Sequence, residues 1–127
     1  MDLHLITVEQ ALFAHQKIVA ATGGSQGLRD VGLLDSALAR PAASFAGKYL
    51  YKTIFDKAAA LIHSLLLNHP FADGNKRTAT YLGYRFLEIN GYILKVSNKE
   101  LVQFALDVES KKLDLPKISA WLKKHSK

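Results

Sequence analysis

The chain has 127 residues, with 17 lysines and arginines against 11 aspartates and glutamates, a formal net charge of +6 and 49% hydrophobic residues. This composition is typical of one globular domain and excludes a disordered chain, and the absence of cysteine excludes disulfides, thiolate metal sites and a cysteine nucleophile. The longest apolar stretch, residues 58–67, is about half of the roughly 20 residues that a transmembrane helix needs. The first residues also lack the pattern of a signal peptide. We therefore expect a single soluble, cytoplasmic domain over residues 1–127.

The first third of the chain predicts two helices. Thr7 begins a sequence with the spacing of a capping box, which predicts a helix to about Thr22, where two glycines follow. Asp30 is placed to cap a second, shorter helix. We expect this helix to end at Arg40, because Pro41 disfavours a helical conformation in the residue before it.

Two longer helices are predicted in the centre of the chain. The first begins near Thr53 and ends around Asn68, and one buried stripe is expected along it, at Ile54, Ala58, Leu61 and Leu65. The second covers residues 75–90, and Gly91 is placed for a left-handed C-terminal cap.

The last third predicts two more helices. Residues 92–96 have the most strand character in the chain but are too few to form a sheet. Ser97 begins a second capping box, for a helix to about Ser110, and Asp114 with Pro116 suits the start of a final helix. No repeat or linker is visible, so the sequence predicts one all-α domain: a compact bundle of about six helices with at most a short hairpin or flap.

Residues 69–78 carry the chemistry. This stretch, HPFADGNKRT, places an imidazole, a carboxylate, a glycine, an amide and two adjacent cations at a loop that leads into a helix. The first N–H groups of a helix lack internal partners and carry partial positive charge, so they bind anions. Lys76 and Arg77 lie in this first turn, where cations are disfavoured, and a bound polyphosphate would explain them. His69 has an intrinsic pKa suited to accepting a proton near neutral pH, and Asp73 is a candidate magnesium ligand.

The same stretch resembles the active-site motif of the Fic/Doc (Fido) superfamily, His-Pro-Phe-x-[Asp/Glu]-Gly-Asn-Gly-Arg-x-x-Arg. Residues 28–41 and 87–91 are similar to other signatures of the death-on-curing (Doc) toxin branch, so the resemblance covers nearly the whole chain. Two departures favour that branch: Lys76 replaces the glycine, and Thr80 replaces the second arginine, of the adenylyl-transferring enzymes. In the Doc branch ATP is bound in reverse, so the resemblance implies transfer of its γ-phosphate.

The resemblance also implies a role for each site residue. His69 would be the general base, and Asp73 would orient it or bind Mg²⁺. Lys76 and Arg77 would stabilise the transferred phosphoryl group. Phe71, Gly74 and Asn75 would complete the nucleotide and phosphate site; Asn75 alternatively caps the helix. The expected cofactors are ATP and Mg²⁺.

The expected biological role is that of a toxin in a type II toxin–antitoxin pair. The resemblance implies a protein kinase that blocks translation by phosphorylating a translation protein, with a threonine of elongation factor Tu as the expected target. No glutamate follows the spacing of the self-inhibitory motif of Fic enzymes, [Ser/Thr]-x-x-x-Glu-[Gly/Asn]. We therefore expect inhibition by a separate antitoxin, whose C-terminal segment folds on binding.

Two alternatives to the kinase remain: transfer of an adenylyl or other nucleotidyl group by the same fold, and an inactive binding module with a basic surface. No zinc finger or helix-turn-helix pattern supports direct binding of nucleic acid. Other polar groups are interpreted structurally: Arg29 with Asp30 as a helix cap with an ion pair, and His63 as a histidine of the core or its rim. Residues 47–52 are the candidate for a substrate-docking flap.

Overall fold

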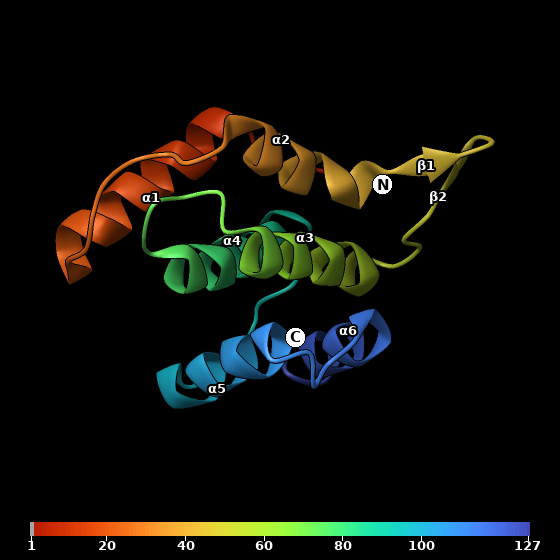
Figure 1. Cartoon of the computed structure of the whole chain (residues 1–127). Helices are drawn as coiled ribbons and strands as arrows, with labels where there is room; N and C mark the ends of the chain where they lie inside the picture. The colour runs from red at the N-terminus through yellow and green to blue at the C-terminus, as the bar shows by residue number, and fades with distance from the viewer. Residues whose placement is uncertain (1) are drawn as a thin grey trace.

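The computed structural model describes residues 2–127. Within this range the chain forms six α-helices, one 3₁₀ helix and a two-stranded antiparallel hairpin, which confirms the predicted fold class. In chain order these are α1 (Val8–Thr22), α2 (Val31–Ala39), η1 (Arg40–Ala42), β1 (Ser44–Phe45), β2 (Lys48–Tyr49), α3 (Ile54–Asn68), α4 (Asn75–Ile89), α5 (Asn98–Glu109) and α6 (Leu115–Lys124). Figure 1 labels the α-helices and the two strands. No helix in the described part of the chain is long and apolar enough to cross a membrane.

The helices begin where local hydrogen bonds satisfy their first N–H groups. Thr7 and Ser97 form the predicted capping boxes of α1 and α5, and Asp30 and Asp114 cap α2 and α6. Thr53 also forms a capping box, with Asp56, at the start of α3. These caps confirm the predicted helix starts to within one residue.

Helix α2 ends beside Arg40, as predicted, but the predicted reason for this end is wrong. Arg40 keeps a helical conformation, with φ −56° and ψ −38°, and α2 continues directly into the 3₁₀ turn η1, which contains Pro41. The Arg40 guanidinium donates to Ser64 Oγ at 2.6 Å and to the Tyr51 hydroxyl at 2.9 Å. Because these contacts fix Arg40 against α3 and the segment after the hairpin, tertiary structure overrides the local preference of a residue before proline.

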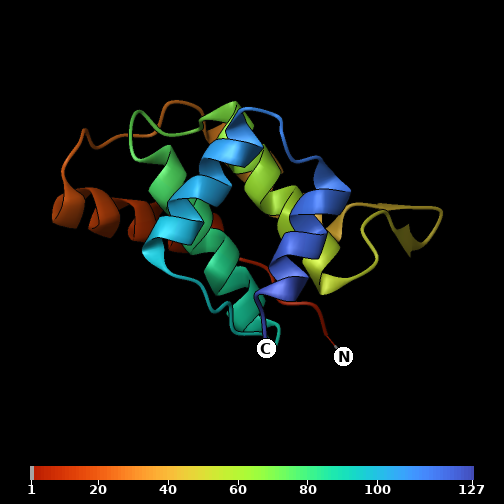
Figure 2. The ribbon, with the colours of Figure 1, turned by 90° about the horizontal axis from the view of Figure 1, so that it is seen from below.

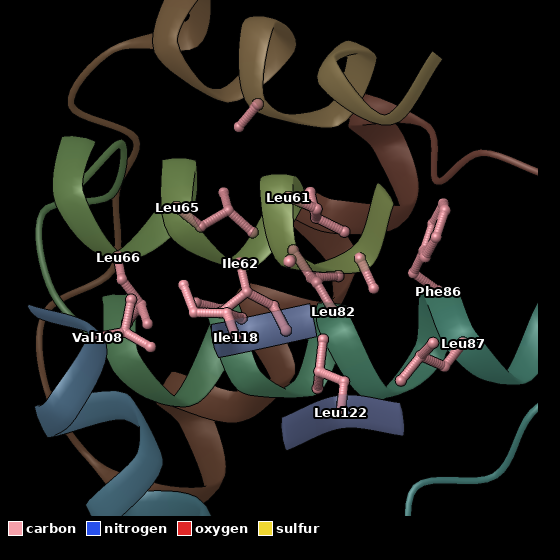
Figure 3. Packing of buried hydrophobic residues seen from close by; sticks show 14 of the residues in the cluster. Leu61, Ile62, Leu65, Leu66, Leu82, Phe86, Leu87, Val108, Ile118 and Leu122 are labelled. Atoms are coloured by element: carbon pink, nitrogen blue, oxygen red, sulfur yellow. The ribbon is translucent and has the colours of Figure 1, made fainter. Parts of the chain in front are cut away.

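Helix α3 lies in the middle of the molecule, with α1 and α2 on one side and α5 and α6 on the other (Figures 1 and 2). The prediction of a single buried stripe was therefore incomplete, because α3 packs against α2, α4, α5 and α6. Its buried residues cover almost the whole circumference: Phe55, Lys57, Ala58, Ala59, Ala60, Leu61, Ile62, Ser64, Leu65 and Leu66. Figure 3 shows Ile62 of α3 in one cluster with Leu82 of α4 and Ile118 of α6. Residues 69–74, the first part of the predicted motif, connect the two central helices α3 and α4.

The hairpin does not lie where strand propensity was highest. It is formed by β1 and β2, and it projects from the bundle in both views (Figures 1 and 2). Residues 92–96 instead extend beside the C-terminus, where the backbone groups of Ile93 and Lys127 exchange hydrogen bonds. The hairpin turn contains Ala46 and Gly47, both with positive φ. Both strands are too short to be detected from propensity.

A buried lysine anchors the hairpin to the bundle. Lys57 of α3 is 3% exposed, and its ammonium group donates to the carbonyls of Tyr51 and Lys52. The same group lies 4.2 Å from the centre of the Tyr49 ring, and burial lowers the pKa of Lys57. These contacts hold the base of the segment predicted as a flap, residues 47–52.

Candidate active site

The loop between α3 and α4 is closed by one side chain. Asn75 Oδ1 accepts a hydrogen bond from the Phe71 N–H at 3.0 Å, and its Nδ2 donates to the Phe71 carbonyl at 2.9 Å. The residue before the helix, Gly74, has φ +73° and ψ 18°, the left-handed region that favours glycine. Asn75 is therefore the first helical residue and holds the loop, so the alternative that it caps the helix is wrong.

The N-terminus of α4 remains open to an anion. Among the residues that the structure describes, no side chain caps its first turn. An added Cβ at Gly74 would lie 3.1 Å from Cγ2 of Val19 and 3.6 Å from Nε2 of His15, so glycine lets the loop pack tightly against α1. Free N–H groups at this end bind negative charge. This end of α4 is where the sequence predicted an anion site, and anion binding there stays a prediction.

His69 lies at the edge of that site. It ends α3 in a left-handed conformation, with φ 47°, and its side chain is 50% exposed. Its Nε2 is 3.4 Å from Oε2 of Glu109, and Oε1 of the same carboxylate is 3.4 Å from Nζ of Lys76. One carboxylate therefore reaches both the expected base and the expected phosphate-binding cation.

Asp73 is held by backbone groups rather than placed to orient His69. Its Oδ1 accepts from the Gly74 N–H at 2.8 Å, and its Oδ2 accepts from the Ser25 N–H at 3.1 Å. These two hydrogen bonds, with a smaller contribution from nearby positive charge, hold the pKa of Asp73 below its ordinary value of 3.8. Asp73 is therefore ionised at neutral pH, and the carboxylate in contact with His69 is that of Glu109.

Arg77 contacts the end of α1. Its guanidinium nitrogens donate to the carbonyls of Thr22 and Gly23, each at 3.4 Å. Carbonyl groups at the end of a helix carry partial negative charge, which stabilises this arginine. Both cations in the first turn of α4 thus have protein partners. Their position alone no longer requires a bound polyphosphate.

Phe71 is a core residue rather than a wall of the pocket. It is 2% exposed, and its ring stacks on His15 of α1 with 3.9 Å between ring centres and an interplanar angle of 6°. The buried His15 donates through Nε2 to the Asp73 carbonyl at 2.7 Å. The Phe71 side chain therefore packs the loop onto α1, and its backbone N–H and carbonyl bond to Asn75, so its contact with a nucleotide stays a prediction.

Arg29 fixes the backbone on the other side of His69. Its side chain donates to the carbonyls of His69, at 2.8 Å, and Asn68, at 2.5 Å. Its backbone N–H, like that of Asp30, donates to the Pro70 carbonyl. The sequence predicted an ion pair between Arg29 and Asp30. The structure confirms the cap by Asp30. Arg29 instead donates hydrogen bonds to the free carbonyls at the end of α3.

If His69 acts as the predicted general base, replacing Arg29 by alanine lowers turnover about tenfold, because His69 loses the group that fixes its left-handed backbone and misplacement of a catalytic group is costly. The KM for ATP should change much less, since Arg29 bonds to the backbone carbonyl of His69 and not to the N-terminus of α4. Steady-state kinetics of R29A test this, with R29K as the matched control. Lysine keeps the charge but not the planar fork, so it should restore only part of the activity. An R29A variant with normal kcat and a raised KM would contradict this role.

Three residues at the site were missed by sequence reasoning: His15, Arg29 as a backbone anchor, and Glu109. His15 and Glu109 belong to α1 and α5, far from the motif in sequence. One local signal existed for Glu109, because an acidic residue in the last turn of a helix is disfavoured and calls for a partner. The predicted site residues themselves lie on one loop and one helix turn, so proximity in sequence places them together.

The donor set for a metal is small. Within residues 2–127 no group of three or more His, Cys, Asp or Glu side chains could hold a metal ion. Magnesium commonly takes one or two carboxylates and fills its other positions with phosphate oxygens and water. The ionised Asp73 fits this mode, in which protein and nucleotide bind the ion together.

Comparison with known proteins identifies the family of this chain. The model of the Fic/DOC family matches residues 5–87. Toxin Doc of Mycolicibacterium smegmatis (strain ATCC 700084 / mc(2)155) is 54% identical over 71 residues, which cover 56% of this chain and 55% of that protein. The matched part therefore spans about half the length of this relative.

Proposed function

This chain belongs to the Fic/DOC family, and on that premise we propose that it is a toxin that transfers the γ-phosphoryl group of ATP to a hydroxyl of a translation protein. A threonine of elongation factor Tu is the first candidate target. The similarity to Toxin Doc supports the Doc branch within the family. A cytoplasmic place of action follows from such a target.

One observation carries the proposal. The Glu109 carboxylate lies 3.4 Å from both His69 Nε2 and Lys76 Nζ, beside the uncapped N-terminus of α4. A single anionic group can therefore contact the imidazole and the ammonium together. A γ-phosphoryl group bound at the same place would bring its phosphorus beside the residue that deprotonates the attacking hydroxyl.

In the proposed reaction, His69 accepts the proton of the target hydroxyl while the hydroxyl oxygen attacks the γ-phosphorus of ATP. The bond between that phosphorus and the β–γ bridging oxygen breaks, and ADP leaves with the electron pair. Lys76 and the N–H groups of α4 stabilise the negative charge of the phosphoryl oxygens, and Arg77 adds to the positive field. Mg²⁺ held by Asp73 and by phosphate oxygens would neutralise further charge on the nucleotide.

Two positions support phosphoryl over nucleotidyl transfer. Lys76 fills the position where adenylyl-transferring relatives have a glycine that leaves space for phosphates. Thr80, in place of their second arginine, is 8% exposed and donates its hydroxyl to the Lys76 carbonyl at 3.0 Å. Position 80 therefore lacks the cation that would hold a terminal phosphate in the orientation needed for adenylyl transfer.

An antitoxin segment would bind in the groove between α1 and α4. This groove has a volume of about 960 Å³, and Leu5, Phe13 and Tyr81 of its lining are exposed apolar or aromatic side chains. Lys17 and Arg85 add positive charge at the same surface. An amphipathic acidic segment matches both features: its apolar side chains would fill the groove as it folds, and its carboxylates would pair with the cations.

The experiment that tests the reaction uses purified elongation factor Tu and magnesium-ATP labelled at either the γ- or the α-phosphate. We expect label to reach the target only from the γ-position, and intact-mass analysis to show one added phosphoryl group. A reaction with EDTA in place of Mg²⁺ serves as the control. Label that arrives from the α-position would refute phosphoryl transfer and support the nucleotidyl alternative.

A further inference from the structure

We propose that Glu109 is an internal anion that competes with the incoming phosphate for Lys76 and His69, and thereby weakens nucleotide binding until it is displaced. The inference rests on the proposed function, because it assumes that a nucleotide phosphate binds at this place. Glu109 lies outside the motif, as the last residue of α5. It does not have the sequence context of the known self-inhibitory motif.

The contacts of the Glu109 side chain are confined to the site. Its two carboxylate oxygens approach Nε2 of His69 and Nζ of Lys76, and within residues 2–127 it has no hydrogen bond to another partner. The side chain is only 18% exposed, so water screens this contact less than it would a surface ion pair. The negative charge of Glu109 therefore acts on His69 and Lys76, the two groups that the proposed reaction uses.

Electrostatics explains why Glu109 is in place before a nucleotide binds and why a nucleotide displaces it. The C-terminus of α5 disfavours a negative charge, and the N-terminus of α4 disfavours the positive charge of Lys76. The two residues stabilise each other across the helix ends. A triphosphate carries more negative charge than one carboxylate and also accepts hydrogen bonds from the N–H groups of α4. Two anions cannot share Lys76 without repulsion, so the carboxylate has to move away.

Displacement also changes what His69 can do. In a neutral imidazole one ring nitrogen is a donor and the other an acceptor. The carboxylate beside Nε2 favours a proton on that nitrogen, which makes it a donor and not a base. Once Glu109 moves away, Nε2 is free to accept the proton of the target hydroxyl. The same step that admits the phosphate thus releases the base.

The test compares E109Q with D107N by calorimetric titration of magnesium-ATP into the full chain. Glutamine keeps the shape of Glu109 and removes its charge. Asp107 is on the same helix and its carboxylate accepts a hydrogen bond from Gln103, so D107N removes the same charge away from the site. We expect E109Q to bind ATP about fivefold more tightly. Repulsion between a phosphate and a nearby, partly shielded carboxylate weakens binding by about this factor. For D107N we expect less than about a twofold change.

A double-mutant cycle with Lys76→Met tests whether the effect of E109Q on ATP affinity depends on the Lys76 ammonium group. Without the ammonium the two anions no longer compete for one cation, so E109Q should change ATP affinity much less in the K76M background. If E109Q does not fold, judged by circular dichroism, E109A replaces it with the same expectation.

The possible outcomes separate the two proposals. Wild-type protein that binds and transfers phosphate, with an E109Q variant of equal or weaker ATP affinity, would overturn only the role of Glu109. The same holds if E109Q keeps its ATP affinity but loses turnover, since Glu109 would then position His69. If neither wild type nor E109Q binds magnesium-ATP, the proposed function fails and this inference fails with it.

Discussion

Replacement of His69 by alanine is expected to abolish transfer of phosphate to the target, with turnover reduced about a thousandfold, the usual range for a general base. The imidazole is half exposed, and among residues 2–127 its charged side-chain partner is Glu109. Its loss should leave the thermal unfolding midpoint within about 2 °C of wild type, because few stabilising contacts depend on it. The measurement is the initial rate of label transfer from γ-labelled ATP, together with a thermal melt.

His4→Ala is the matched control for this variant. His4 is exposed and lies outside the site, so H4A should keep the wild-type rate. The comparison also decides between an enzyme and a binding module. If H69A still arrests growth with full effect, the basic-module alternative is correct and the catalytic proposal is not.

A second large effect is expected at Gly83, where α4 crosses α3. An added Cβ would lie 2.6 Å from Cγ1 of Ile62 and closer still to its Cδ1, nearer than packed atoms can approach. Both helices lie at the centre of the core (Figure 3). We expect Gly83→Val to lower the free energy of unfolding by about 3 kcal/mol, at the upper end of overpacking effects. Urea unfolding followed by circular dichroism measures it.

Gly83→Ala with Ile62→Ala tests whether the contact itself is responsible. Ile62→Ala alone should cost about 2–5 kcal/mol, because it leaves a cavity next to Gly83. In the double variant the new methyl group occupies part of that cavity and meets no Ile62 side chain, so the two effects should be less than additive by about 1 kcal/mol. Strict additivity would show that the helices adjust to an added side chain without strain.

The first turn of α4 shows how far a local argument extends. Two adjacent cations at the start of a helix indicated an anion site, because positive charge is disfavoured there. The structure gives each cation a protein partner: Lys76 meets Glu109, and Arg77 meets the carbonyls at the end of α1. The open helix end and Gly74 are still arranged for an anion, so the interpretation now depends on geometry rather than on unpaired charge.

The sequence by itself determined the helices and the motif. Capping residues such as Thr7, Ser97 and Asp114 satisfy N–H groups within three positions, so the signals for helix starts are local and can be recognised without a fold. The candidate site was also predicted, because residues 69–77 occupy one loop and one helix turn. Short separation along the chain keeps these residues together in any compact structure.

Only the tertiary structure decided which distant groups surround that motif. Glu109, Arg29 and His15 reach it from three other segments, through contacts that depend on how α1 and α5 pack against α4. The hairpin at residues 44–49 was likewise invisible, because each strand has two residues and is anchored by Lys57 and not by its own propensity. Contacts between distant residues are selected by the packing of the whole core, and no local pattern of side chains specifies them.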